Sequence, residues 1–415
     1  MKIVIIGGGI IGCSSAWFLH QAGHRVTILD SAEAMPNCSH GNAGYVCPSH
    51  FIPLATPGIV QQGLRWMMNR ESPFYIQPRL NLDLLRWGWY FMHAANEKRV
   101  AEAAIPLRDI ALFSQSIYEQ WAAIPEFNFG YEKKGLLEIF QTETVASHAA
   151  HTCAKALELG LTGTRLINYD ELRILEPDLK FTALGAIWFP GDAHLFPQLL
   201  MTRLKTKLTQ AGVEFIQEKA VDFSVTESQL KSVITANQSI SADAVVLAAG
   251  SWSSELIRLL HLSIPLVAGR GYSLTMSNED FKLQHPAILT EGRVALTPLQ
   301  GGKLRIGGTM EIVPTNAPPN LSRMKGVLKA VSEFLPDKSI VFPEEKDIWY
   351  GYRPCSADGL PYIGRPKRWN NLVIATGHAM IGLSLGAGTG KLVADLMDDK
   401  PSAINLRPFH PDRFN

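Results

Sequence analysis

The apolar and polar positions along the chain alternate between strand-like and helix-like patterns, and their order predicts an α/β protein. Short apolar runs, typical of strands that are buried on both faces, alternate with helical stretches, and glycine stands at several of the junctions. The predicted strands of this kind are residues 3–6, 25–29, 214–217, 244–248 and 372–376. The first predicted helix follows strand 3–6 and ends near Gly23. The other predicted helices cover about 82–100, 101–124, 143–158, 197–212 and 388–397.

Residues 263–312 instead alternate strand and turn, which predicts a mostly antiparallel sheet. The strand and helix units near the start, the middle and the end of the chain predict one Rossmann-like, dinucleotide-binding domain that is split along the sequence. An α+β substrate domain is interleaved with it. The predicted cofactor domain comprises residues 1–48, 190–258 and 350–415, and the predicted substrate domain comprises residues 49–189 and 259–349.

The composition narrows the class of partner. The chain has 415 residues, of which 46% are hydrophobic and 19% charged, and this suits a protein with a large core and two or three domains. The formal net charge is +1, so nucleic acid is not an expected partner. Five cysteines, an odd number without a C-x-x-C pair, favour a reducing compartment, and no zinc-type spacing of histidines predicts a metal site.

The first thirty residues carry a dinucleotide-binding motif. Gly7, Gly9 and Gly12 follow the first strand in G-x-G-x-x-G spacing, and Asp30 closes the second strand. The glycines allow a tight turn, a close approach of a pyrophosphate and close packing of helix on strand, while the aspartate can accept from ribose hydroxyls. The motif by itself fits NAD or FAD, and Asp30 disfavours NADP.

Two later stretches suggest the chemistry. "TGHAMIGLSLGAGTG" at 376–390 places a glycine-rich loop between a strand and a helix, whose positive end can face a ligand. "GYRPCSADGLPYIG" at 351–364 holds Arg353 beside Pro354 and a tight Asp-Gly turn. A stiffly held guanidinium is suited to a carboxylate, which it grips with two parallel hydrogen bonds.

These motifs, with "SHGNAG" at 39–44, "GDAHLFP" at 191–197, "LAAGSWS" at 247–253, "RGYSLT" at 270–275 and "RIGGTMEI" at 305–312, resemble the D-amino-acid oxidase family of FAD-dependent amine oxidoreductases. "GNAGYVCPSHFIPLATPG" is most similar to its D-amino acid dehydrogenase branch. The resemblance implies FAD, and the chain has Gly41 where some relatives carry a histidine that binds FAD covalently, so we expect noncovalent FAD. The implied cofactor-binding residues are Gly7, Gly9, Gly12, Asp30, His40, Gly41, Asn42, Ala43, Gly44, Val221, Gly250, Gly377, His378, Gly382 and Gly386.

The resemblance also implies catalytic roles. Arg353 would hold the substrate carboxylate, so that the Cα–H faces flavin N5 for hydride transfer, and Tyr272 would donate to the carboxylate or the amine. Ala295 and the pair Ala379-Met380 stand where glycine oxidase has a tyrosine and an arginine, which implies a more apolar pocket. Arg305 falls near a basic residue that sarcosine oxidases use with oxygen.

The implied reaction is the oxidative deamination of a D-amino acid, including cyclic ones such as D-proline or hydroxy-D-proline. A glycine- or sarcosine-type oxidase and a non-catalytic flavin-binding subunit are the alternatives. The electron acceptor, which could be a quinone, oxygen or a redox protein, and the oligomeric state stay open. The aromatic residues of 82–100 suit either the core or a membrane surface, so we expect a cytoplasmic protein with peripheral contact at the inner face of the membrane as an option.

Overall fold

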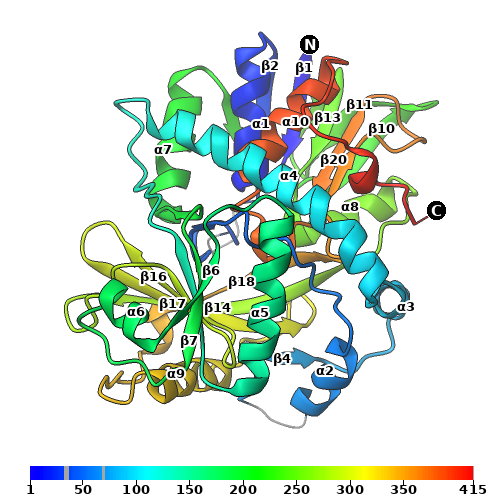
Figure 1. The fold of residues 1–415 in the computed structure, drawn as a ribbon. Coiled ribbons are helices and arrows are strands. Elements are labelled where there is room, and N and C mark those ends of the chain that lie inside the picture. The colour runs from blue at the N-terminus through cyan, green and yellow to red at the C-terminus, as the bar shows by residue number, and fades with distance from the viewer. Residues whose placement is uncertain (32–36, 68–70, 415) are drawn as a thin grey trace.

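The computed structural model describes residues 1–31, 37–67 and 71–414, and it consists of two sheets that lie one above the other (Figure 1). The upper sheet has six strands, all parallel except β19 at one edge. In spatial order they are β19 (Tyr362–Gly364), β20 (Leu372–Thr376), β13 (Ala244–Leu247), β1 (Lys2–Ile6), β2 (Arg25–Leu29) and β9 (Glu214–Ile216). The four strands in the middle are almost wholly buried, as their apolar sequences predict.

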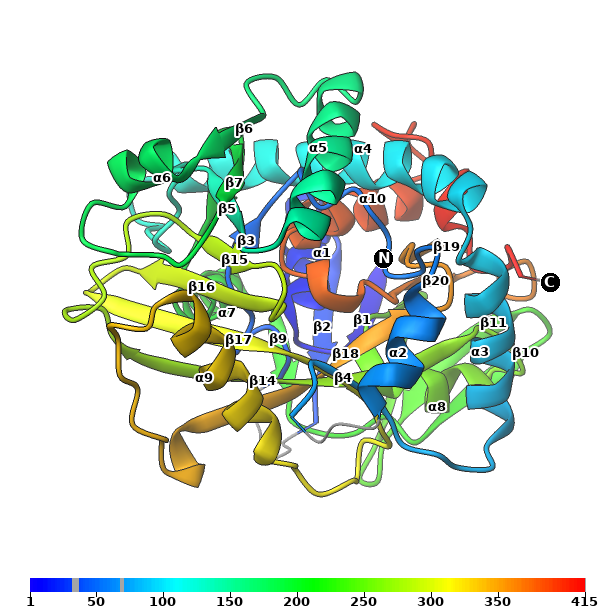
Figure 2. The same cartoon turned by 60° about the horizontal axis from the view of Figure 1, so that its bottom comes forward.

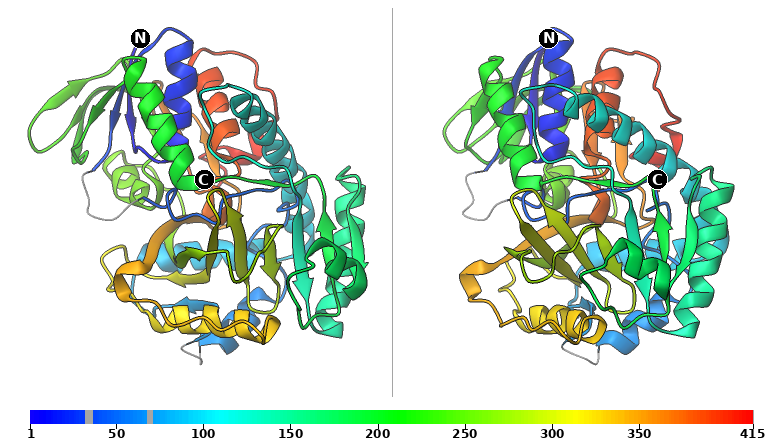
Figure 3. Two further views of the ribbon diagram at one scale, coloured as in Figure 1. Left: turned by 90° about the vertical axis from the view of Figure 1, so that its left-hand side faces the viewer. Right: turned by 60° about the vertical axis from the view of Figure 1, so that its left-hand side comes forward.

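Helices cover one face of this sheet, and a small three-stranded sheet covers part of the other (Figures 1 and 3). The helices are α1 (Ile10–Gln21), α7 (Pro197–Gln210), α10 (Gly386–Met397) and the long α4 (Glu97–Ala122). The opposite face packs on α8 (Ser253–Leu259) and on β10 (Asp222–Thr226), β11 (Gln229–Ile234) and β12 (Ser239–Ser241). The Rossmann-like domain that the sequence predicts, split along the chain, is confirmed.

The lower sheet has nine strands, of which all neighbours are antiparallel except two pairs. Its path is β18 (Ile348–Ser356), β14 (Leu266–Ser277), β17 (Lys303–Ile312), β16 (Val294–Leu299), β15 (Ala287–Leu289), β5 (Leu136–Phe140), β7 (Gly185–Phe189) and β6 (Arg165–Asn168), with β4 (Phe74–Ile76) on β17. The helices around it are α2 (Ile59–Met67), α5 (Glu143–Glu158), α6 (Tyr169–Leu175) and α9 (Ser322–Phe334). Figure 2 shows α9 and the strands of this sheet from below.

The structure departs from the predicted domain division at two places. Strand β18, which the division assigns to the cofactor domain from residue 350, pairs with β14 in the lower sheet. Helix α4, assigned to the substrate domain, packs on α10, and its Tyr118 and Trp121 join the core under the upper sheet (Figure 2). The predicted division follows position along the chain. In the structure, each of the two segments buries its apolar face on the sheet that lies beside it.

The predicted helix 82–100 is two helices. Helix α3 (Leu82–Ala94) ends before Asn96, whose side chain accepts from the Arg99 N–H and begins α4. The aromatic cluster of α3 is divided accordingly, because Trp87 is 2% exposed and Trp89 is 58% exposed. Ser251 precedes the helix after β13 without capping it: its hydroxyl donates to the Tyr352 carbonyl, and α8 begins at Ser253.

Candidate active site

The chain turns sharply where β1 meets α1, at the carboxyl edge of the upper sheet. Gly7 has φ +113°, and a Cβ there would lie 2.3 Å from the Ala248 carbonyl oxygen. A Cβ on Gly12 would lie 1.8 Å from the Gly7 oxygen, so the helix touches the turn. The N-cap Gly9 has no side chain, and the Ile10 N–H donates to the Ser39 hydroxyl at 3.0 Å. The N–H groups that follow in the first turn of α1 suit a phosphate.

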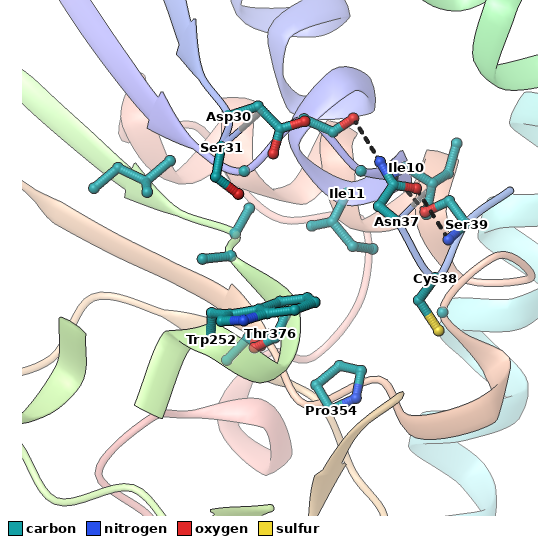
Figure 4. A pocket seen from close by; sticks show the side chains of 18 of the residues that line it. Ile10, Ile11, Asp30, Ser31, Asn37, Cys38, Ser39, Trp252, Pro354 and Thr376 are labelled. Atoms are coloured by element: carbon teal, nitrogen blue, oxygen red, sulfur yellow. Dashed lines mark hydrogen bonds between the residues drawn. The ribbon is translucent and has the colours of Figure 1, made fainter. Parts of the chain in front are cut away.

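This turn borders a cavity of about 350 Å³ (Figure 4). Its wall also comes from the ends of β2, β9, β13 and β20, from the loop at 37–42, and from residues 378–383. In the view of Figure 4, Asp30 and Ser31 lie across the cavity from Trp252, and Cys38 and Pro354 line its other end. An elongated cavity with an open helix N-terminus and an acid suits a dinucleotide such as FAD.

Asp30 lies where the sequence places it, at the end of β2. Its carboxylate occupies the space beside Gly8, where a Cβ would come within 2.6 Å of Oδ2. Lys205 of α7 also lines the cavity, with Nζ 3.8 Å from Asp30 Oδ2. Asp30 therefore faces the cavity and is free to accept from a ribose hydroxyl.

The loop at 37–42 is held by a buried arginine. Arg305, 1% exposed, donates to the carbonyls of His40 and Asn42 at 3.0 and 2.7 Å, and burial lowers its pKa to about 10. His40 lines the cavity and bonds Asn37 Oδ1 at 3.1 Å, and burial lowers its pKa too. Arg305 itself does not line this cavity.

Of the other residues predicted to bind the cofactor, Gly250, His378 and Gly382 line this cavity, whereas Gly44, Val221, Gly377 and Gly386 do not. Gly44 and Gly377 have φ of +93° and +80°, and each packs tightly against neighbouring groups, the Leu195 carbonyl and the Tyr362 ring. Gly386 allows α10 to touch Ile10 of α1. Val221 is 45% exposed, and its neighbour Ala220 lines the cavity instead.

The sequence predicts that the N-terminal end of the last helix, α10, faces the ligand, and the structure places a different segment there. A 3₁₀ turn, η3 (Ala379–Ile381), and Gly382 precede α10, so this turn, not the first turn of α10, borders the cavity. His378 is buried, its Nε2 is 3.0 Å from Thr389 Oγ1, and its Nδ1 has no partner among the described residues. Burial lowers the pKa of His378 to about 3, so the ring is neutral.

A second cavity, of about 460 Å³, lies against the lower sheet. Cys38 and Asn42 line both cavities, so the two meet at this loop. Gly41 and Ala43, predicted to border the flavin, line the second cavity. A Cβ on Gly41 would lie 2.0 Å from the Trp349 ring, which is why this chain carries no side chain at the position of the covalent histidine.

Arg353 projects from β18 into the second cavity, close to where the cavities meet. Its guanidinium lies over Gly271, where a Cβ would come within 2.1 Å of Nη2, and its Nη1 donates to the Thr309 carbonyl at 2.6 Å. Within the described part of the chain no carboxylate pairs with it, and burial lowers its pKa. A buried cation without an anion is costly, so the site is built for an anionic ligand.

Thr309 owes its position to an irregularity in the sheet. The register between β14 and β17 shifts between Arg270 and Tyr272, and Thr309 has φ +65°, which is strained for a threonine. The irregularity aims the Thr309 carbonyl at Arg353. Thr309 also lines the cavity, and its hydroxyl is buried and has no partner in the described chain. The indole N–H of Trp349, another lining residue, is likewise buried and without a partner there.

The hydroxyl of Tyr272, which is predicted to donate to the substrate, already has two partners within the protein. Its ring lines the cavity, but its hydroxyl donates to Glu311 Oε2 at 2.8 Å and accepts from the Asn320 N–H at 2.7 Å. Glu311 also pairs with Arg270 and Arg323 on buried strands and helix. The hydroxyl therefore completes a structural network, and burial raises its pKa.

Sequence reasoning missed several lining residues. Residues 217–220 follow β9 at the same sheet edge as Asp30, and the βαβ order of the chain could have indicated them. Trp252 and Tyr352 lie in the motifs at 247–253 and 351–364, next to residues that were predicted. Trp349 and Glu138 carry no local signal, and only the fold brings them to the second cavity.

The comparisons with known proteins agree with this geometry. The chain matches the family model "DAO: FAD dependent oxidoreductase" over residues 2–396. It therefore belongs to this family of FAD-dependent oxidoreductases. We assign its FAD to the cavity beside β1, which is called the FAD cavity.

The chain is similar to one curated relative and to two solved structures. A D-amino acid dehydrogenase of Helicobacter pylori (strain J99) is 29% identical over 408 residues, 97% of this chain and 96% of the relative. The crystal structure of glycine oxidase from Geobacillus kaustophilus has a TM-score of 0.77 at 23% identity and covers 99% of both chains. L-proline dehydrogenase from P. horikoshii has a TM-score of 0.73 at 19% identity, covering 100% of this chain and 97% of that one. The two structures show the shared fold.

Proposed function

We propose that this enzyme dehydrogenates D-amino acids, cyclic ones such as D-proline or hydroxy-D-proline included. The observation that carries the proposal is Arg353, a partly buried guanidinium with no anionic partner among the described residues, near the junction of the FAD cavity and the second cavity. An α-carboxylate is the anion that every amino acid supplies. The similarity to a D-amino acid dehydrogenase over almost the whole chain supports the D-series.

The residues of the chain would bind and orient the substrate. Arg353 would grip the carboxylate in the cavity that Thr309 and Trp349 also line. Bound FAD supplies the oxidant, which accepts a hydride from the α carbon. The resulting imino acid would then be hydrolysed by water, unless the imine is cyclic.

A strong general base is not required in this scheme. The histidines that line the cavities are neutral at pH 7, because burial lowers the pKa of His50 to about 4 and of His378 to about 3. A neutral substrate amine can assist hydride departure with its own lone pair. The chain contributes orientation and the exclusion of water, which the burial of Arg353 indicates.

A quinone in a membrane is one candidate for the electron acceptor. Within the described ranges no helix has the length and apolar character needed to cross a bilayer. Helix α3 nevertheless exposes Leu82, Leu85, Trp89 and Met92, which suits peripheral contact with a membrane that holds quinone. Co-sedimentation with anionic vesicles, compared between the wild type and Trp89→Ser, tests this contact.

The function is tested by anaerobic mixing of the holoenzyme with D-proline, hydroxy-D-proline, other D-amino acids, their L-enantiomers, glycine and sarcosine. We expect the flavin absorbance near 450 nm to bleach with D-amino acids. Bleaching by glycine and sarcosine alone would favour the oxidase alternative. No bleaching by any of them, with dithionite still effective, would favour a non-catalytic subunit. Reoxidation by air or by a quinone then identifies the acceptor.

A further inference from the structure

The floor of the second cavity is a row of residues that are paired directly across six strands. Direct partners on neighbouring strands share one face of a sheet. From β18 to β5 the row is Trp349, Ser273, Gly307, Ala295, Ile288 and Glu138. All six line the cavity, so Glu138 faces the same space as Trp349 and Arg353.

The middle of this row is open, because Ser273, Gly307 and Ala295 are small. Ala295 and Glu138 are two strand spacings apart, or about 10 Å between Cα atoms. A substrate side chain lying over Ala295 would therefore point its end toward Glu138.

Glu138 is a carboxyl group with no partner. Among the described residues, no hydrogen bond or ion pair reaches its side chain, although the residue is largely buried on β5. The nearby Tyr45 hydroxyl is committed to the carbonyls of Ala287 and Leu296. A carboxyl in an apolar site without a donor is costly, and a ligand that brings a donor removes this cost.

The buried groups near Glu138 offer it no hydrogen-bond donor, because Asp192 is an acceptor and Ser49 already donates to Asp192. Asp192 is buried nearby, and its carboxylate accepts from the Ser49 hydroxyl at 2.5 Å and from the Ser49 N–H at 3.3 Å. Cys47, His50 and Asp192 have side-chain atoms within 4.8 Å of one another, but these hydrogen bonds already occupy the aspartate. Burial and the charge of Asp192 raise the pKa of Glu138 to about 7.

We propose that Glu138 is the specificity residue of this enzyme and selects amino acids whose side chain carries a hydrogen-bond donor, such as a hydroxyl, an ammonium or a guanidinium. This inference rests on the proposed function, since it places the substrate carboxylate at Arg353. The small residues between them leave room for side chains of several lengths. The position of Glu138 on β5 is set by the sheet and not by a motif.

The test uses two pairs of substrates that differ in the donor alone. These are hydroxy-D-proline against D-proline, and D-ornithine against D-norleucine, each measured as kcat/KM for bleaching of the flavin. In the wild type we expect the donor-bearing member of at least one pair to be favoured. Glu138→Leu should lower that ratio ~10- to 100-fold through KM of the donor-bearing member, because a hydrogen bond to a buried carboxyl is lost.

Two further variants control the experiment. Glu138→Gln keeps the shape and should lower the ratio for ornithine more than for hydroxyproline, and it decides the question if Glu138→Leu does not retain FAD. Glu158→Gln, on the exposed face of α5, should leave both ratios unchanged. Unchanged ratios in both Glu138 variants, or a wild type that prefers the apolar member of each pair, would overturn this inference and leave the proposed function standing. A wild type that oxidises no amino acid would remove both.

Discussion

The two cavities of this protein are built in different ways. The FAD cavity lies at the carboxyl edge of the parallel sheet and borders a backbone turn with glycines where a side chain would collide. The second cavity lies on the face of a mostly antiparallel sheet, and its character comes from side chains such as Arg353, Trp349 and Glu138. A backbone site suits a cofactor that does not vary, and a side-chain site allows one fold to accept different substrates.

The two sites also differ in which polar groups have no hydrogen-bond or ion-pair partner among the described residues. At the FAD site the open positions are N–H groups at the start of α1, which any phosphate can satisfy. In the second cavity they are the Arg353 guanidinium, the Thr309 hydroxyl, the Trp349 N–H and the Glu138 carboxyl. The difference predicts that damage to the first site removes the cofactor, whereas damage to the second changes the kinetics.

The largest effect is expected from Gly12→Ala. The added Cβ would lie 1.8 Å from the Gly7 carbonyl oxygen, so the helix must move away from the turn. We expect a protein that is purified without FAD, measured as the ratio of absorbance at 450 and 280 nm. Gly88→Ala in helix α3, where nothing lies within 4 Å of the new Cβ, should keep its FAD. A yellow Gly12→Ala variant with normal activity would contradict this description of the cradle.

Arg353→Ala is expected to have the next largest effect. Loss of the charged fork should lower kcat/KM ~100- to 1,000-fold, mostly through KM, because the carboxylate loses its partner. FAD should be retained, since Arg353 does not line the FAD cavity. Arg258→Ala, which removes an exposed ion pair with Asp83, is the matched control and should change kcat/KM by less than about twofold. Near-normal kcat/KM for Arg353→Ala would exclude the carboxylate clamp.

The pH dependence of stability should separate two groups in the second cavity. Burial lowers the pKa of His50 to about 4, so the unfolded chain binds more protons and His50 destabilises the fold as the pH falls from 6.5 to 4. The pKa of Glu138 is raised to about 7, so the folded chain binds more protons and Glu138 stabilises the fold over the same fall. The two contributions oppose each other in the wild type.

Removing either group should expose the other. Between pH 6.5 and 4.5, the free energy of unfolding of His50→Asn should rise relative to the wild type by up to about 1.4 kcal/mol per pH unit of acidification, and that of Glu138→Gln should fall by a similar amount. Equilibrium unfolding in urea at several pH values measures both. Parallel pH profiles for the two variants and the wild type would show that neither group titrates abnormally.

Tyr272→Phe should have the smallest effect on activity. The hydroxyl bonds Glu311 and the Asn320 N–H, so its loss should cost about 1–2 kcal/mol of stability and change kcat/KM by less than about threefold. Thermal unfolding and steady-state kinetics on one preparation test both statements. A large rise in KM with unchanged stability would restore the substrate-binding role that the sequence suggests for Tyr272.

The sequence by itself determined the parts that depend on local spacing. The glycines at 7, 9 and 12 and the acid at 30 lie on one strand–helix–strand unit, so their geometry follows from helix and strand periodicity. The pairing of Arg353 with Pro354 likewise indicated a constrained arginine, and the family resemblance gave its role. These inferences needed no long-range contact.

Only the tertiary structure decided which side chains meet across the sheets. Tyr272 and Glu138 lie on strands of the same sheet, and their sequence patterns do not tell which hydroxyl is already bonded or which carboxyl is left alone. Gly377 and Gly386 sit in a motif that suggests a ligand, yet each is required by packing on a distant ring or helix. Contacts between residues far apart in the chain depend on how whole elements pack, and local spacing does not encode that.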